Sequence, residues 1–326
     1  MSSTPLLSSS GGLPGPNAMH DHPVFLRVSH SPWHAIPQNV LVVLRGFILA
    51  YIVGVSAMLG HHKRTEESDE SAWRHFFDFG LISYGMVFLY HLITFCWTYT
   101  HLYHPEPESV RGGIESWLVR LMSLPSNMGS LRKQFYFTLF YATATVFSFI
   151  NTCIYWSVTR PHEGKAAIIA RAAVPKVAPA VHGHVGGAPK AMHVVDGPFS
   201  DIFGEGWYKT FCIFNLYGIT SAIMVLEIIF LNSAKRPQAL GSHFFGLMVN
   251  AGLYLAWAAC GKAWTGADAF FWLNEEEVGS KEAVTAYCMG FVLLSPIMYT
   301  LKLGFIGIRE GLTRERNSHS LEELEH

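Results

Sequence analysis

Six long apolar stretches dominate this chain, and each is long enough to cross a bilayer as a helix. A spanning helix needs about 20 mostly apolar residues. Because lipid offers no partner to an open backbone group, such a segment must close its hydrogen bonds within itself. The sequence therefore predicts an all-α fold, a polytopic membrane protein with six transmembrane helices in one bundle. The predicted spans are Ile36–Gly60, Phe76–Thr100, Phe135–Val158, Lys209–Ser233, Ser242–Trp264 and Ala283–Arg309.

Composition supports this fold class and narrows the partners. Half of the 326 residues are hydrophobic and 14% are charged, which is too apolar for an ordinary soluble chain. The formal net charge is −1 and neither end carries a basic block, so we expect no nucleic-acid partner. The five cysteines lie in predicted spans, where cysteine acts as a small apolar packing residue. The residues indicate neither a metal site nor a cofactor.

Three regions are predicted along the chain. Residues 1–35, rich in Ser, Gly and Pro at the start, are expected to form a disordered cytoplasmic tail. Residues 36–309 form the six-helix transmembrane domain, and residues 310–326 a second cytoplasmic tail. Within the domain, the Ala-, Pro-, Gly- and His-rich loop 159–208 is expected to be flexible.

Basic residues predict the orientation of the bundle. An even number of spans places both termini on one face, and cytoplasmic loops carry an excess of Lys and Arg. Leaving out the long third loop, we expect an integral membrane protein of the endoplasmic reticulum or plasma membrane with both termini in the cytoplasm. The terminal face has ten basic residues: Arg27, Arg111, Arg120, Arg132, Lys133, Lys235, Arg236, Arg309, Arg314 and Arg316. The opposite face has four: Lys63, Arg64, Arg74 and Lys281.

Polar residues within the spans are the site candidates, because they are costly in lipid and usually face the bundle interior. By depth, Arg45, His91, Glu227, Asn250 and Lys302 fall in the cytoplasmic half, and Asp78, Asn151 and Asn215 in the outer half. Counting from the span ends gives Glu227, Asn250 and Lys302 similar depths. We therefore expect these three to converge, with Glu227 and Lys302 as an ion pair that is either structural or part of a pathway.

The remaining polar positions have simpler interpretations. Arg45 is expected to snorkel toward its span end, and His91 to be a core histidine with its hydrogen bonds satisfied. A Thr/Ser/Tyr stripe on the third span is expected to pack helix against helix. That stripe comprises Thr138, Tyr141, Thr145, Ser148, Thr152 and Tyr155, and a stripe on the fifth span includes His243, Gly246 and Asn250.

The absence of several enzyme motifs argues against some classes of function, and four segments of the chain suggest a family. The chain has no GxSxG, HExxH or P-loop sequence, so soluble-type hydrolases, zincins and nucleotide-driven transporters lose support. The chain resembles the superfamily that includes the androgen-induced membrane hydrolases and the Rolling stone-like proteins, especially fungal-type members. The resemblance is carried by the segments Trp73–Gly85, Ile150–Trp156, Trp207–Pro237 and His243–Ala258.

The resemblance implies a six-span bundle and, in its hydrolase branch, cleavage of fatty-acyl esters by an intramembrane threonine working with a histidine. Those residues would lie at the start of the second span and in the fourth span. This chain instead has Phe76, Phe77 and Asp78 at the first place and Asn215 and Leu216 at the second. No catalytic residue can be named, and whether the protein is an enzyme stays open.

Three functional hypotheses follow. The first is a lipid-related bundle whose partners are the bilayer and an acyl-chain lipid ligand. The second is a non-catalytic scaffold or interaction protein like the Rolling stone proteins. A transporter is the third.

Overall fold

The computed structural model describes residues 23–66, 72–104, 112–125, 127–164, 206–237 and 239–322. Within these ranges the regular structure is helical, with no strand, and six helices are long and apolar enough to cross a membrane. The predicted fold class is therefore confirmed. The spans are α2 (Gln38–Glu66), α3 (Phe79–Tyr103), α5 (Leu131–Ile154, helical on to Gly164), the helix from Trp207 to Leu231, α10 (Leu240–Thr265) and α12 (Lys281–Glu322).

The fourth span is interrupted by two π-helical turns. It runs as α8 (Trp207–Phe214), a π turn at Asn215–Ile219, α9 (Thr220–Leu226) and a π turn at Glu227–Leu231. A π turn inserts an extra residue into the helix and is frequent at functional positions. Both turns begin at a polar site candidate, Asn215 in the first and Glu227 in the second.

Helix α5 is the centre of the bundle. It contacts α1 (Val24–Val28), α3, α9, α10 and α12. In its apolar window 72% of the residues are buried, against 28–44% in the other five spans. Ser221 of α9 donates to the carbonyl oxygen of Ser148 and lies 2.6 Å from the hydroxyl of Thr152. The hydroxyl stripe therefore packs helix against helix, as predicted.

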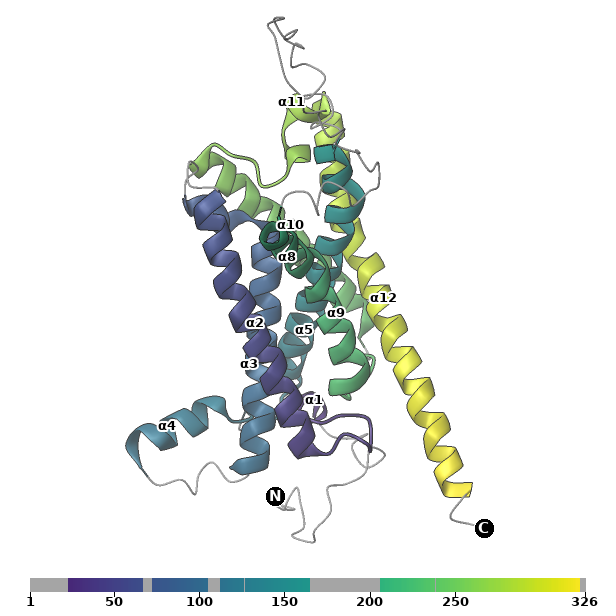
Figure 1. Cartoon of the computed structure of the whole chain (residues 1–326). Helices are drawn as coiled ribbons and strands as arrows, with labels where there is room; N and C mark the ends of the chain where they lie inside the picture. The colour runs from purple at the N-terminus through teal and green to yellow at the C-terminus, as the bar shows by residue number, and fades with distance from the viewer. Residues whose placement is uncertain are drawn as a thin grey trace, which may run out of the picture.

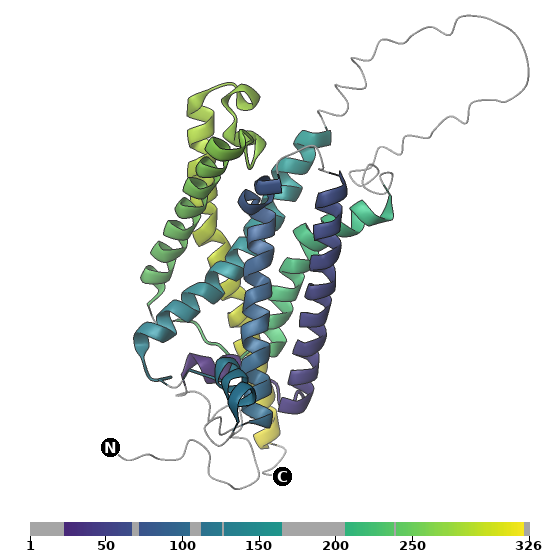
Figure 2. The ribbon, with the colours of Figure 1, turned by 90° about the vertical axis from the view of Figure 1, so that its left-hand side faces the viewer.

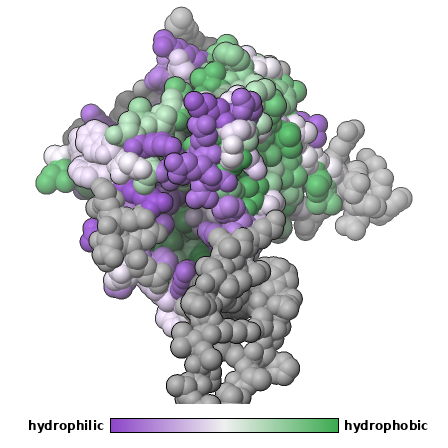
Figure 3. All heavy atoms as spheres, turned by 90° about the horizontal axis from the view of Figure 1, so that it is seen from above, coloured by the Kyte–Doolittle hydropathy of each residue, from purple (hydrophilic) through white to green (hydrophobic). Residues whose placement is uncertain are grey.

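The two ends of the bundle differ, and we name them after the short helices they carry. The α1 end holds α1, α4 (Gly113–Met122) and the C-terminal part of α12 (Figure 1). The α11 end holds α11 (Glu275–Val278), and Figure 2 shows the same separation after a quarter turn. Seen from the α11 end, hydrophilic residues gather over the middle of the bundle beside apolar flanks (Figure 3).

The predicted boundaries need three corrections. Residues 24–28, assigned to a disordered tail, form α1, because Phe25 packs its ring 5.5 Å from those of Trp97 and Phe137. The loop predicted from residue 159 begins later, since the third span stays helical to Gly164; residues 165–205 lie outside the described part of the chain. The tail predicted from residue 310 continues α12 as far as Glu322. Residues 1–22 also lie outside the described ranges.

Candidate functional site

Glu227 is paired with Arg45 inside the bundle. One Arg45 nitrogen, Nη2, donates to Glu227 Oε1 at 2.9 Å, and both side chains are 0% exposed. Arg45 also donates to the carbonyl oxygens of Val28, Thr94 and Leu231. The expectation that Arg45 snorkels is wrong, because carbonyl groups and a carboxylate satisfy its guanidinium where it lies.

Asn232, just after the second π turn, links this pair to α5 and α12. Its amide nitrogen donates to Tyr141 Oη at 3.0 Å and to Glu227 Oε1 at 3.4 Å. Arg309 of α12 donates to its backbone carbonyl at 2.7 Å and to that of Ala234 at 2.6 Å. Tyr90 completes the cluster by donating to Glu227 Oε1 at 2.9 Å. Five of the spans and α1 thus meet around one carboxylate.

Lys302 does not join this cluster as an ion-pair partner. Its ammonium nitrogen lies 3.4 Å from the centre of the Tyr141 ring, a cation–π contact. The residue is 3% exposed, and it has no ion pair or hydrogen bond among the described residues. The predicted Glu227–Lys302 pair is therefore wrong, because Arg45 takes the place beside Glu227.

The other candidate amides make separate contacts between helices. Asn250 donates to Thr143 Oγ1 at 2.8 Å, so it joins α10 to α5 and does not converge with Glu227. Asn151 donates to the carbonyl oxygen of Leu216 at 2.9 Å. Asn215, 1% exposed, accepts from Tyr51 and donates to the carbonyl oxygen of Phe211. Asn151 and Asn215 thus meet at the first π turn.

Asp78 and His91 complete the sequence-predicted set. Asp78 caps α3: its carboxylate accepts from the backbone nitrogens of Gly80 at 2.7 Å and Leu81 at 3.2 Å, and lies 3.5 Å from Lys63 Nζ. His91 is 1% exposed, and neither ring nitrogen has a hydrogen-bond partner among the described residues. The expected satisfied core histidine is therefore buried but unsatisfied by protein groups.

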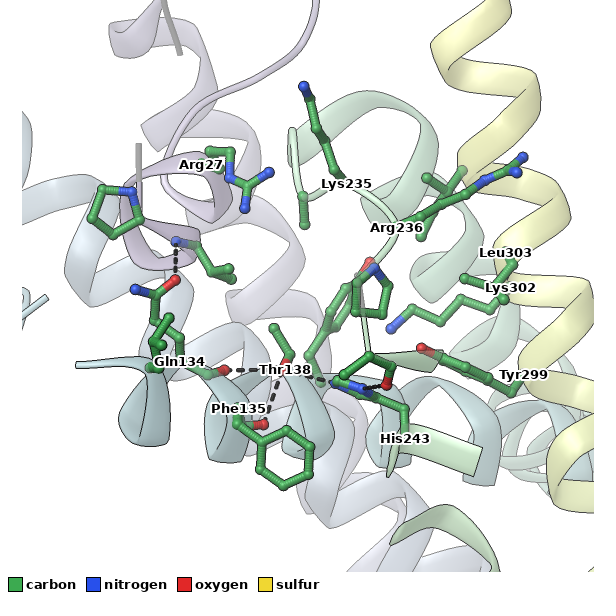
Figure 4. Close-up of a pocket in the computed structure, with 18 of the residues that line it drawn as sticks. Arg27, Gln134, Phe135, Thr138, Lys235, Arg236, His243, Tyr299, Lys302 and Leu303 are labelled. Atoms are coloured by element: carbon green, nitrogen blue, oxygen red, sulfur yellow. Dashed lines mark hydrogen bonds between the residues drawn. The ribbon is translucent and has the colours of Figure 1, made fainter. Parts of the chain in front are cut away.

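A cavity of about 850 Å³ lies at the α1 end of the bundle (Figure 4). Lys302 points into it from α12, and the inner wall includes the buried Tyr141, His243 and Tyr299. Its exposed lining residues include Leu131 and Arg236. Four lining side chains are Lys or Arg, namely Arg27, Lys235, Arg236 and Lys302, and no lining residue is acidic.

Charge in this cavity is one-sided. Burial lowers the pKa of the Arg27 guanidinium below its ordinary value, and the nearby Glu310 carboxylate acts in the opposite direction. Arginine stays protonated through such shifts. The cavity also has apolar lining from Phe135, Leu303 and Ile306. An amphiphile with an anionic group matches both features.

Thr138 and His243 are in contact in the wall of the same cavity. The Thr138 hydroxyl lies 3.0 Å from His243 Nε2, and His243 Nδ1 lies 2.9 Å from the carbonyl oxygen of Ala239 (Figure 4). A carbonyl oxygen can only accept, so Nδ1 carries a hydrogen, and in the neutral ring Nε2 is then an acceptor for the hydroxyl. Thr138 Oγ1 also lies 2.9 Å from the carbonyl oxygens of Gln134 and Phe135, so its single hydrogen has three competing acceptors.

Sequence reasoning missed this pair although both members were visible. Thr138 and His243 each belong to a polar helical stripe, and each begins a span at the terminal face. Because successive spans alternate in direction, the third and fifth spans start at the same face, and α5 and α10 are in contact. Arg309 and Asn232 are not predicted as site residues, because each lies at the end of a predicted span, where a polar residue is not unusual.

Comparison with known proteins adds no relative. No family model, curated protein or solved structure matches this chain.

Proposed function

We propose that this multi-pass membrane protein binds an anionic amphiphile, a lipid with an acyl chain and a phosphate or carboxylate group, in the cavity at the α1 end. The observation that carries the proposal is Lys302, a 3%-exposed lysine that lines this cavity without an ion-pair partner among the described residues. A charge inside a membrane bundle without a partner of opposite charge is costly. An anionic ligand would remove much of that cost.

The other residues that line the cavity support the same class of ligand. Arg27, Lys235 and Arg236 add positive charge with no acidic residue among the lining. Arginine and lysine are the usual partners of phosphate and carboxylate groups. The apolar residues Phe135, Leu303 and Ile306 supply the surface that an acyl chain needs.

A binding assay tests this proposal. Protein in phosphatidylcholine nanodiscs is titrated with lysophosphatidic acid, with lysophosphatidylcholine and with inorganic phosphate, and binding is followed by native mass spectrometry. We expect lysophosphatidic acid to bind most tightly. Lys302→Met should weaken its binding, Lys302→Arg should retain it, and the control Lys281→Met, on an exposed lysine of the same helix, should not change it.

Each other outcome opposes the proposal. Equal binding of the two lysolipids would mean that charge is not recognised. Binding that survives Lys302→Met would mean that the Lys302 ammonium group does not hold the ligand. Binding of phosphate as strong as that of lysophosphatidic acid would identify a small-anion site. No binding of any probe would favour the scaffold hypothesis.

We propose that the protein lies in the endoplasmic reticulum or plasma membrane and is oriented with its α1 end in the cytoplasm. The ten-to-four excess of basic residues supports this side. Protease protection of terminal tags in sealed vesicles tests it. A protected C-terminal tag in vesicles with their cytoplasmic face outward would reverse the assignment.

One observation favours a second function, hydrolysis of an acyl ester in the same cavity. The Thr138–His243–Ala239 carbonyl arrangement has the order nucleophile, base and orienting group. Thr138 Oγ1 would attack the ester carbonyl carbon while His243 Nε2 takes its proton. The ester C–O bond then breaks, the leaving alcohol takes that proton, and water releases the acid from the acyl-threonine.

Covalent labelling with a lipophilic β-lactone probe tests the second function. Labelling of wild type that is lost in Thr138→Val but kept in Thr300→Val, an exposed threonine on α12, would support it. Labelling that survives Thr138→Val would exclude Thr138 as the nucleophile. Lysophosphatidic acid binding should survive Thr138→Val in either case, so the two functions are tested separately.

A further inference from the structure

Helix α4 exposes a continuous apolar face at the α1 end of the bundle. Four of its ten residues recur at steps of three and one, which places them on one side of a helix. These are Ile114, Trp117, Leu118 and Leu121, which are 79%, 62%, 43% and 66% exposed. Glu115, Ser116 and Arg120 lie on the opposite side.

The depth of α4 is fixed by α3. Thr100 Oγ1 lies 3.1 Å from the carbonyl oxygen of Met122, the last residue of α4. Thr100 is three residues before Tyr103, where α3 ends, which corresponds to about 4.5 Å of helix. The end of α4 is therefore level with the last turn of a membrane span.

The direction of α4 is transverse to the spans. It extends sideways from the foot of α3 in Figure 1 and is seen nearly along its axis in Figure 2. Val119, 7% exposed, is the buried residue of this helix. The aromatic residues Tyr99 and Tyr103 lie at the same level of α3, with their rings 4.8 Å apart. Tyrosine and tryptophan are enriched where a membrane meets water.

We infer that α4 lies in the interface of the bilayer that the six spans cross, with its apolar face against the acyl-chain boundary. The membrane is the chosen occupant because the contact between Thr100 and Met122 holds the end of α4 at the level of the last turn of α3, a membrane span. An amphipathic helix lying in this plane buries its apolar side about 5–10 Å into the headgroup boundary. The inference stands independently of what the cavity binds.

Spin-label accessibility tests this inference. In a variant with all five cysteines replaced by alanine, a nitroxide is attached at Trp117→Cys or Leu121→Cys, with Glu115→Cys as the matched control on the polar side. The full chain is reconstituted in phosphatidylcholine vesicles. At 117 and 121 we expect oxygen to relax the label more than a water-soluble nickel chelate does, and at 115 we expect the reverse.

Two results would overturn the inference. Greater access of the nickel chelate at 117 and 121 would place this face in water. Protection from both reagents would mean that protein covers it, either a second copy of the chain or another partner. Unchanged melting of each labelled variant relative to the cysteine-free parent excludes misfolding as the cause of either result.

Discussion

Glu227 and Arg45 lie 182 positions apart in the sequence, yet their side chains meet at 2.9 Å with neither exposed to solvent. The contact joins the first span to the fourth at the start of a π turn. A buried charge pair is weak evidence for stability in itself, because desolvation offsets attraction, but removing one partner leaves the other uncompensated.

This asymmetry gives the first prediction. Arg45→Met should destabilise the protein by about 3–5 kcal/mol, since it leaves the Glu227 carboxylate buried without a cation. Adding Glu227→Gln should recover part of that loss, measured as the melting temperature in detergent. Arg132→Met, at an exposed position, is the control. If Arg45→Met has the same melting temperature as wild type, the pair has no stabilising role.

Arg309 should stabilise the linker between the fourth and fifth spans, which includes residues 232–237. It donates to the carbonyl oxygens of Ile228, Asn232 and Ala234, and hydrogen bonds of charged groups contribute about 1.5–3 kcal/mol each. Arg309→Met should therefore speed hydrogen exchange across residues 232–237, with Lys281→Met as the control. Unchanged exchange there would contradict the assigned role.

Gly261 should tolerate no side chain. A Cβ at this position would lie 2.7 Å from Cδ1 of the buried Phe77, whereas a Cβ at Gly252 on the same helix would meet nothing within 4 Å. Overpacking of this kind costs about 1–3 kcal/mol. Gly261→Ala should lower the melting temperature while Gly252→Ala leaves it unchanged. Equal melting of the two variants would refute the close contact.

Asp78 should act as a helix cap. Asp78→Ala removes both acceptor contacts to the start of α3 and should cost about 1 kcal/mol, the usual loss at an N-cap. Asp78→Asn keeps a capping oxygen and should retain most of the stability, which thermal melting can compare. A loss in Asp78→Asn equal to that in Asp78→Ala would point to the Lys63 contact as the more important one.

The six spans could be predicted from sequence because length and apolarity alone decide whether a helix can cross lipid. The pairs of side chains that contact each other within the bundle could not be predicted in this way. Depth grouped Glu227 with both Arg45 and Lys302, but depth says nothing about the rotation of a helix. The π turns at Asn215 and Glu227 change that rotation, and no residue pattern in the fourth span signals them.

Asp78 shows a different limit. An aspartate directly before an apolar helix is an N-cap signal, whereas depth in the predicted span only groups Asp78 with Asn151 and Asn215. The Thr138–His243 contact could have been anticipated from two stripes that begin at the same face, although the stripes alone do not fix which members touch.

The central position of α5 has a consequence for how the chain enters the membrane. Its apolar window is 72% buried in the finished bundle, and α9, α10 and α12, which cover much of it, follow it in the sequence. When α5 leaves the ribosome, those helices do not yet exist, and its hydroxyl-bearing face can be covered only by the two spans already made. Until the last three spans have been synthesised, this face of α5 therefore lacks the helices that cover it in the complete bundle.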